Sequence, residues 1–131
     1  MIKISIIGGG VAGYSAAMAL ARSHIDVNLF TGFSHGGQIV LAPHLNNYPG
    51  IETSGTQLIA NMHKQVLDWK VKVYEDVAIE KICLDENLTL IDSNGNEFVN
   101  DAITKQIESL RPLVLHMHQY LQVSDAANPH L

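Results

Sequence analysis

The sequence contains a single cysteine, Cys83. An intrachain disulfide is therefore excluded, and so is the Cys-x-x-Cys pair that carries out thiol–disulfide exchange. A reactive thiol needs an electropositive and accessible setting, whereas Cys83 stands between Ile82 and Leu84 in a strand-like stretch. We expect Cys83 to serve as a small buried hydrophobic residue.

Positive charge and long apolar runs are also scarce. Lys and Arg together number 8 against 13 Asp and Glu, and the net charge of −5 comes with no basic patch, so no nucleic-acid partner is expected. No apolar run approaches the roughly 20 residues of a membrane span. The chain opens on a strand-like stretch without a signal peptide, so we expect a cytoplasmic protein with no membrane contact. Its 131 residues, 47% of them apolar, suit one folded domain and not two.

The N-terminus carries the strongest pattern. The apolar residues 2–7 predict a buried strand, and glycine then occupies the first, third and sixth positions of residues 8–13. The alanine-rich residues 14–23 predict a helix, and residues 25–30 predict a second strand. Strand, glycine turn, helix and strand within about 30 residues are typical of a βαβ unit that binds a dinucleotide.

Each glycine of this turn has a physical reason to be there. Gly8 permits the tight turn, Gly10 lets a pyrophosphate approach the backbone, and Gly13 lets the helix pack closely on the strand. The free N–H groups of the first helical turn, at Val11 and Ala12, then face the phosphates. The alternative is a glycine turn that binds nothing, which the flanking strand, helix and second strand argue against.

The end of the second strand departs from the usual dinucleotide pattern. Binders of NAD commonly place Asp or Glu there to hold the ribose hydroxyls. Here the strand ends at Thr31 and Gly32, and Asp26 lies too early, where the strand begins. This departure weakens a general assignment to NAD.

With this strand end, the sequence resembles the low-molecular-weight thioredoxin reductases, which are pyridine nucleotide–disulfide oxidoreductase flavoproteins. Those enzymes also carry Thr-Gly in place of the acid, and the resemblance runs from residue 1 to about residue 103. The matching stretches are residues 6–17, 30–32, 36–38, 47–50 and 58–65.

The resemblance implies that the cofactor is FAD. Its pyrophosphate is expected on the glycine turn, next to the strand end of Thr31 and Gly32. By the resemblance, the flavin half of FAD is contacted by residues Gly36, Gly37, Gln38 and Asn47. The adenine is contacted by the backbone of Val77 and Ala78. Without the neighbouring motifs, Gly36 and Gly37 would equally suit an ordinary turn.

The fold that follows is an α/β class: a Rossmann-like FAD-binding domain with a parallel sheet, an N-terminal βαβ unit and a small antiparallel β flap. A helix is expected from Gln57 to about Trp69, with an apolar stripe that includes Leu67 and Trp69. The expected strands beyond it are residues 70–74, 78–84, 88–92 and 97–99, the last two joined by an Asn94-Gly95 hairpin.

We expect residues 1–131 to form one domain, with a divergent segment from residue 104 onward. Residues 104–111 predict a helix ended by Pro112, and residues 113–118 predict a strand that substitutes for one the family has there. Within it, the apolar residues 113–115 are our expected contact in a homodimer or with a partner subunit. His116 and His118 would share a strand face, but without a third ligand no metal site is predicted.

The chain ends on a stretch similar to the family's second flavin motif. By that resemblance Asp125 binds the ribityl chain, although Ser124 replaces the motif's glycine and only six residues follow Asp125. Both readings of Asp125, as ligand or as bystander, stay open.

The functional prediction is limited by what is missing. Thioredoxin reduction needs a flavin, a nicotinamide site and a dithiol, and only the flavin part can be assembled here. We therefore expect no complete thioredoxin reductase in this chain alone and name no catalytic residue. Two functions stay open: an FAD-dependent oxidoreductase that takes electrons from a partner or from free nicotinamide, and a non-catalytic dinucleotide-binding or interaction module.

Overall fold

The computed structural model of the chain describes residues 1–33 and 36–105. At its centre is a four-stranded sheet in the order β5-β2-β1-β9, and every neighbouring pair in it is parallel. The strands are β1 (Lys3–Ile7), β2 (Asp26–Gly32), β5 (Lys72–Glu75) and β9 (Ala102–Lys105). The predicted α/β fold with an N-terminal βαβ unit is confirmed.

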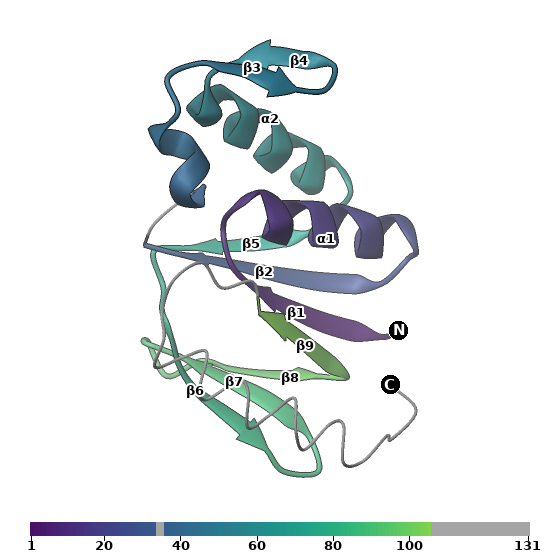
Figure 1. Cartoon of the computed structure of the whole chain (residues 1–131). Coiled ribbons are helices and arrows are strands. Elements are labelled where there is room, and N and C mark those ends of the chain that lie inside the picture. Colours follow the sequence, from purple (N-terminus) through teal and green to yellow (C-terminus); the bar gives the residue numbers. More distant parts are fainter. Residues whose placement is uncertain (34–35, 106–131) are drawn as a thin grey trace, which may run out of the picture.

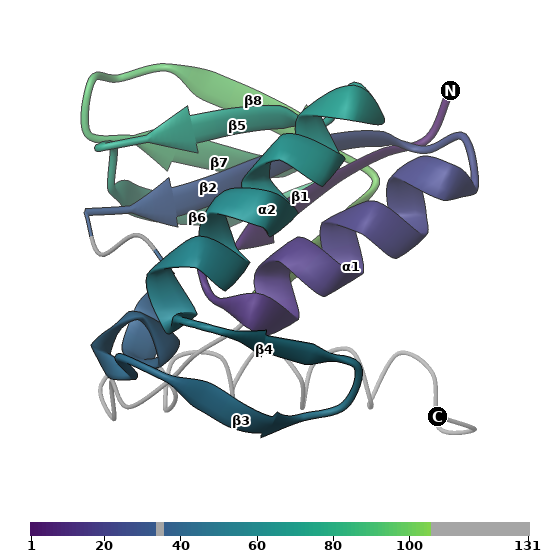
Figure 2. The ribbon, with the colours of Figure 1, turned by 90° about the horizontal axis from the view of Figure 1, so that it is seen from above.

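Two helices, α1 (Val11–Arg22) and α2 (Gly55–Asp68), lie side by side on one face of this sheet (Figures 1 and 2). On α1 the buried Tyr14, Ala17 and Ala21 recur at helical spacing and face the sheet and α2. Ile6 and Leu29, neighbours in the β1–β2 register, are fully buried beneath them. This one core fixes the glycine turn at the carboxyl edge of the sheet.

The apolar stripe predicted for helix α2 does not remain buried to the end of the helix. Ser54 is its N-cap, and the Ser54 hydroxyl accepts a hydrogen bond from the Gln57 N–H at 3.1 Å. Leu67 and Trp69, however, are both 47% exposed. The Arg22 guanidinium lies 5.9 Å from the centre of the Trp69 ring, so Trp69 packs against the end of α1 instead of entering the core.

The antiparallel flap covers the opposite face of the sheet (Figure 1). It consists of β6 (Ile79–Leu84), β7 (Leu88–Asp92) and β8 (Glu97–Asn100) in sequential order. Phe98 of β8 meets Phe30 and Tyr74 of the parallel sheet, with ring centres 5.0 Å and 5.1 Å away. The predicted flap is confirmed, and this aromatic cluster is what joins it to the sheet.

The flap hairpin uses a different turn from the one its Asn-Gly pair suggests. Only Gly95 has a positive φ there, at 83°, so the turn is not the primed type with two such residues. The 2% exposed Asp92 organises it instead: its carboxylate accepts hydrogen bonds from the N–H groups of Asn94 and Asn96, both at 2.9 Å. The side chain of Asp92 therefore determines this turn.

The chain segment that connects β2 to α2 forms a small lobe outside the sheet. It contains the 3₁₀ helix η1 (Gly37–Leu41) and the hairpin of β3 (Leu45–Tyr48) and β4 (Ile51–Thr53), which projects beyond the first turn of α2 (Figure 1). At its base the Gly55 N–H donates to the Ala42 carbonyl at 2.9 Å. The sequence did not predict this hairpin.

The end of the described chain corrects one prediction. Thr104 and Lys105 belong to β9, parallel to β1, and do not open a helix. The β-branched Ile103 and Thr104 favour a strand, and the free edge of β1 supplies its hydrogen-bond partners. The expected helix beyond Lys105, the strand 113–118, the His116/His118 pair and Asp125 all lie outside the described residues. Cys83 is half-buried, so it is less enclosed than predicted.

Candidate functional site

The glycine turn between β1 and α1 has the packing that a close strand-to-helix approach requires. Gly8 follows β1 with φ at 144°, and its N–H donates to the Phe30 carbonyl at 2.8 Å. A Cβ on Gly13 would lie 2.0 Å from the Gly8 carbonyl oxygen, which no side chain tolerates. Gly13 therefore lets α1 begin directly against the turn.

In contrast to Gly13, Gly10 faces open space. Among the residues that the structure describes, a Cβ on Gly10 would meet only the Gly36 carbonyl oxygen, at 3.7 Å, which is ordinary contact. Gly10 is the N-cap of α1, no side chain caps the helix, and no acid stands in its first turn. The first N–H groups of a helix have no partner within it, so those of Val11, Ala12 and Gly13 present the positive dipole end to this space. The chemistry suits a pyrophosphate.

Gly9 has a role that the sequence pattern did not predict. A Cβ there would lie 2.8 Å from the Thr31 Cβ, so the turn packs directly on the end of β2. Thr31 is 5% exposed, and its hydroxyl donates to the Tyr74 carbonyl at 3.4 Å. The Thr31 side chain thus ties the glycine turn to β2 and β5, and the only signal for this in the sequence was the third consecutive glycine.

The second glycine segment lies against the first. The Gly36 N–H donates to the Gly9 carbonyl at 2.8 Å, and a Cβ on Gly36 would strike the Val40 side chain at 2.3 Å. Gly36 and Gly37 have φ of 90° and 65°, which favour glycine. Gly37 and Gln38 begin η1 from this point. The structure therefore brings these two predicted site segments together.

The remaining predicted residues are more scattered. Asn47 lies in β3, in the outlying hairpin. Val77 and Ala78 link β5 to β6, and both backbone polar groups of Ala78 already bond to Ser93, at 3.3 Å and 2.8 Å. Asp125 lies outside the described residues.

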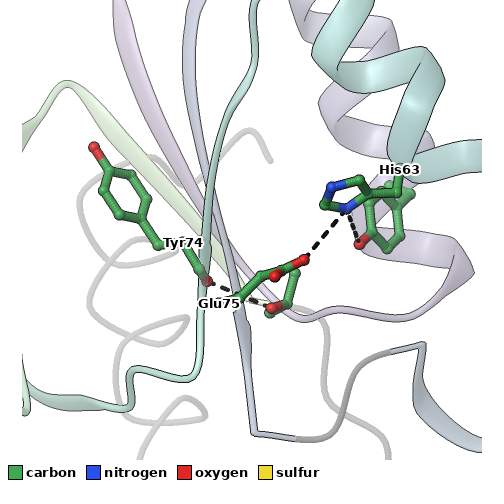
Figure 3. A network of polar contacts seen from close by, with 5 residues as sticks. His63, Tyr74 and Glu75 are labelled. Carbon is green, nitrogen blue, oxygen red and sulfur yellow. Dashed lines mark hydrogen bonds and ion pairs between the residues drawn. The ribbon is translucent and has the colours of Figure 1, made fainter. Parts of the chain in front are cut away.

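A polar network beside the turn was missed by sequence reasoning (Figure 3). The Tyr14 hydroxyl lies 3.1 Å from His63 Nδ1, and that nitrogen lies 3.5 Å from a Glu75 carboxylate oxygen. Burial and then the nearby Glu75 carboxylate raise the pKa of the Tyr14 phenol. One residue each from α1, α2 and β5 meets here.

The ends of β2 and β5 are neighbours at this edge. Gly32 pairs in register with Glu75, and the Asp76 N–H donates to the Gly32 carbonyl at 3.1 Å. Gly32 has φ of 69°, and a Cβ there would meet nothing within 4 Å in residues 1–33 and 36–105. The position thus has room for a side chain, but its backbone conformation disfavours one.

The parallel sheet, its helices and the open glycine turn together define a Rossmann-like dinucleotide-binding fold. The family model for pyridine nucleotide-disulphide oxidoreductases matches residues 2–107. The chain belongs to that family, as the resemblance of its motifs indicated.

Individual relatives point the same way. The thioredoxin reductase of Buchnera aphidicola is 34% identical over 103 residues, which cover 77% of this chain and 32% of that protein. That of Rickettsia prowazekii is 33% identical over 104 residues, or 77% of this chain and 33% of that protein. The chain thus spans about a third of the length of these curated relatives.

Solved structures agree on the fold. The Lactococcus lactis thioredoxin reductase superposes with a TM-score of 0.72 at 26% identity, over 84% of this chain and 38% of that one. The Gloeobacter violaceus thioredoxin reductase has a TM-score of 0.72 at 23% identity, over 83% and 38%, and supports the fold alone.

In the part of the chain that the structure describes, no group of three or more His, Cys, Asp or Glu side chains is placed to hold a metal ion. None of the helices in that part is long and apolar enough to cross a membrane.

Proposed function

We propose that this chain is an FAD-binding module of a thioredoxin reductase-like oxidoreductase. The observation that carries the proposal is the open space over Gly10, at an uncapped helix N-terminus, next to the Gly36 loop. That arrangement fits a dinucleotide pyrophosphate, and the family resemblance selects FAD among dinucleotides.

The chain's own residues would bind and orient the cofactor. The N–H groups of Val11, Ala12 and Gly13 would hold the pyrophosphate, with Gly8 and Gly10 leaving the backbone bare. Thr31 and Gly32 would border the adenosine half. Gly36, Gly37, Gln38 and Asn47 would line the flavin half, with Asp125 as a further ribityl contact. Because Ala78 is engaged with Ser93, the adenine contact would fall chiefly to Val77.

When bound, FAD supplies the electron transfer, and the protein supplies its position. This chain has one cysteine and hence no dithiol. Electrons would therefore pass between FAD and a nicotinamide or disulfide held by another subunit, or a free nicotinamide. We place the chain in the cytoplasm as a homodimer or as a subunit of a larger assembly.

A titration with FAD, followed by quenching of flavin fluorescence and by gel filtration, tests the proposal. Gly10→Ala should weaken FAD binding by about ten-fold or more, because the new Cβ occupies the space of the pyrophosphate, while the circular dichroism spectrum is kept. Ala19→Ser, on the exposed face of α1, adds one atom away from the turn and should change nothing. Equal FAD affinities for the wild type and Gly10→Ala would overturn the proposal.

The absent dithiol favours one competing function, a dinucleotide-binding module without turnover. The two functions differ in what the bound flavin does. In an oxidoreductase, FAD bound to this chain would be bleached by NADH or NADPH under anaerobic conditions and recover its absorbance with an added acceptor. A bound flavin that neither nicotinamide nor a partner subunit reduces would favour the non-catalytic module.

A further inference from the structure

The acid that usually holds the adenosine ribose is missing from the end of β2, where Gly32 stands. The structure places a carboxylate on the adjacent strand instead. Glu75 ends β5 and is the register partner of Gly32. A carboxylate from Glu75 therefore leaves the sheet at the same edge and one strand away from the usual position.

The Glu75 side chain also points to the correct side. Figure 3 shows Tyr74 and Glu75 on opposite sides of β5, with the Glu75 carboxylate directed toward His63 of α2. Glu75 thus lies on the helix-covered side, with α1. His63 in turn contacts Tyr14, the residue that follows Gly13 of the phosphate turn, at 3.1 Å. The carboxylate therefore lies near the hydroxyl end of the Tyr14 side chain, on the same side of the sheet as α1.

Exposure and electrostatics agree with a ligand role. The Glu75 side chain is 44% exposed, whereas its contact His63 is 31% exposed. Burial, and after it the charge of Glu75, raises the pKa of the Tyr14 phenol, in agreement with the geometry that brings the two side chains together around His63. His63 Nδ1 lies 3.5 Å from a carboxylate oxygen of Glu75.

We propose that Glu75 accepts hydrogen bonds from the ribose hydroxyls of the adenosine half, in place of the acid that β2 lacks, and that His63 positions its carboxylate. The inference rests on the proposed dinucleotide binding and adds which nucleotides are accepted. Glu75, with Asp76 beside it, would repel a 2′-phosphate. The site would then take dinucleotides with an unphosphorylated adenosine ribose.

The experiment compares ADP with 2′-deoxyADP as competitors of FAD on the intact chain. For the wild type, ADP should compete about ten-fold better, because 2′-deoxyADP lacks the hydroxyl that donates to a charged acceptor. In Glu75→Gln the two competitors should become nearly equal. Glu80→Gln, an exposed glutamate of β6, is the matched control and should retain the wild-type ratio.

The ratio separates a ribose contact from a structural ion pair, since a mere loss of stability weakens both competitors alike. If Glu75→Gln does not fold, Glu75→Asp keeps the charge but withdraws it by one methylene, and the ratio should fall at least three-fold. An unchanged ratio in whichever variant folds overturns the inference while the FAD proposal stands. If the wild type does not bind FAD at all, it is the proposed function that fails.

Discussion

A Cβ added to Gly13 would lie only 2.0 Å from the Gly8 carbonyl oxygen, so Gly13, in the first turn of α1, packs directly against Gly8, the first residue of the phosphate turn. Gly10, three residues earlier, has open space on its side. Two glycines of one motif therefore have separable duties, one in packing and one in ligand access.

The first prediction uses that separation. Gly13→Ala should lower the free energy of unfolding by about 1–3 kcal/mol, because the backbone must shift to relieve the overlap. Gly10→Ala should leave stability within about 0.5 kcal/mol. Urea denaturation followed by circular dichroism measures both, and equal losses in the two variants would contradict the assignment.

The second prediction concerns Tyr14. Tyr14→Phe removes its hydroxyl contact to His63 and should cost about 1 kcal/mol of stability at neutral pH. The folded-state pKa of Tyr14 is raised above 10.0, so its contribution is present below pH 10 and is lost as pH rises through that raised value. The thermal midpoint should therefore fall less steeply above pH 10 in Tyr14→Phe than in the wild type. Parallel pH curves would show that Tyr14 is not the group responsible.

A third prediction addresses acid stability through Asp92. Its burial alone would raise the pKa, but hydrogen bonds from the side chain and N–H of Asn96, and from the N–H groups of Asn94 and Gly95, lower it overall. Because the pKa of Asp92 is lower in the folded state, the ionised carboxylate stabilises the fold above pH 3.8. This contribution is lost as the pH falls from 3.8 through the lowered pKa of the folded state. Asp92→Asn should unfold more readily than the wild type at pH 6, with the difference shrinking toward pH 3. Glu97→Gln, at the start of β8, is the control and should follow the wild-type curve.

The fourth prediction is association. Phe33 and Leu41 precede and follow the segment around Gly36 and are 67% and 80% exposed, so a partner that covered both would bury apolar surface. The monomer has a mass of 14.3 kDa, and we expect light scattering of the wild type to give a larger mass. The Phe33→Ser, Leu41→Ser double variant should give a mass closer to that of the monomer. A strict monomer at high concentration would count against a homodimer.

Periodicity and glycine spacing were enough to predict the order of β1, α1 and β2, with the bounds of the two strands correct to within about two residues and those of the helix to within about three. Those signals are local, because each residue there faces a partner set by helix or strand repeat. The strand nature of Thr104 and Lys105 could not be predicted that way, since it depends on the free edge of β1, about 100 residues away in sequence. The same holds for β3 and β4, which are short and pair at only two positions.

The candidate site divides in the same manner. Glycines at this fixed spacing indicate a phosphate-binding turn, so the roles of Gly8, Gly10 and Gly13 could be predicted from the sequence. The Glu75–His63 contact joins residues 12 apart on different elements, and no spacing rule connects them. It follows only from the register of β5 against β2, which places Glu75 beside Gly32.

The position of β1 between β2 and β9 in the sheet determines when β1 can pair with its neighbours during synthesis of the chain. β1 is synthesised first, and β2 covers one of its edges soon afterward, but the other edge waits for residues 102–105. At roughly 5–20 residues per second, translation leaves that edge of the nascent chain unpaired for several seconds. Two hydrogen bonds then join the start of β1 to Asp101, just before β9. The Lys3 N–H donates to the Asp101 carboxylate and the Asp101 N–H donates to the Lys3 carbonyl, both at 2.8 Å. A ribosome stalled before residue 102 would thus hold a chain with a bare, isoleucine-rich strand edge, a natural ligand for a chaperone.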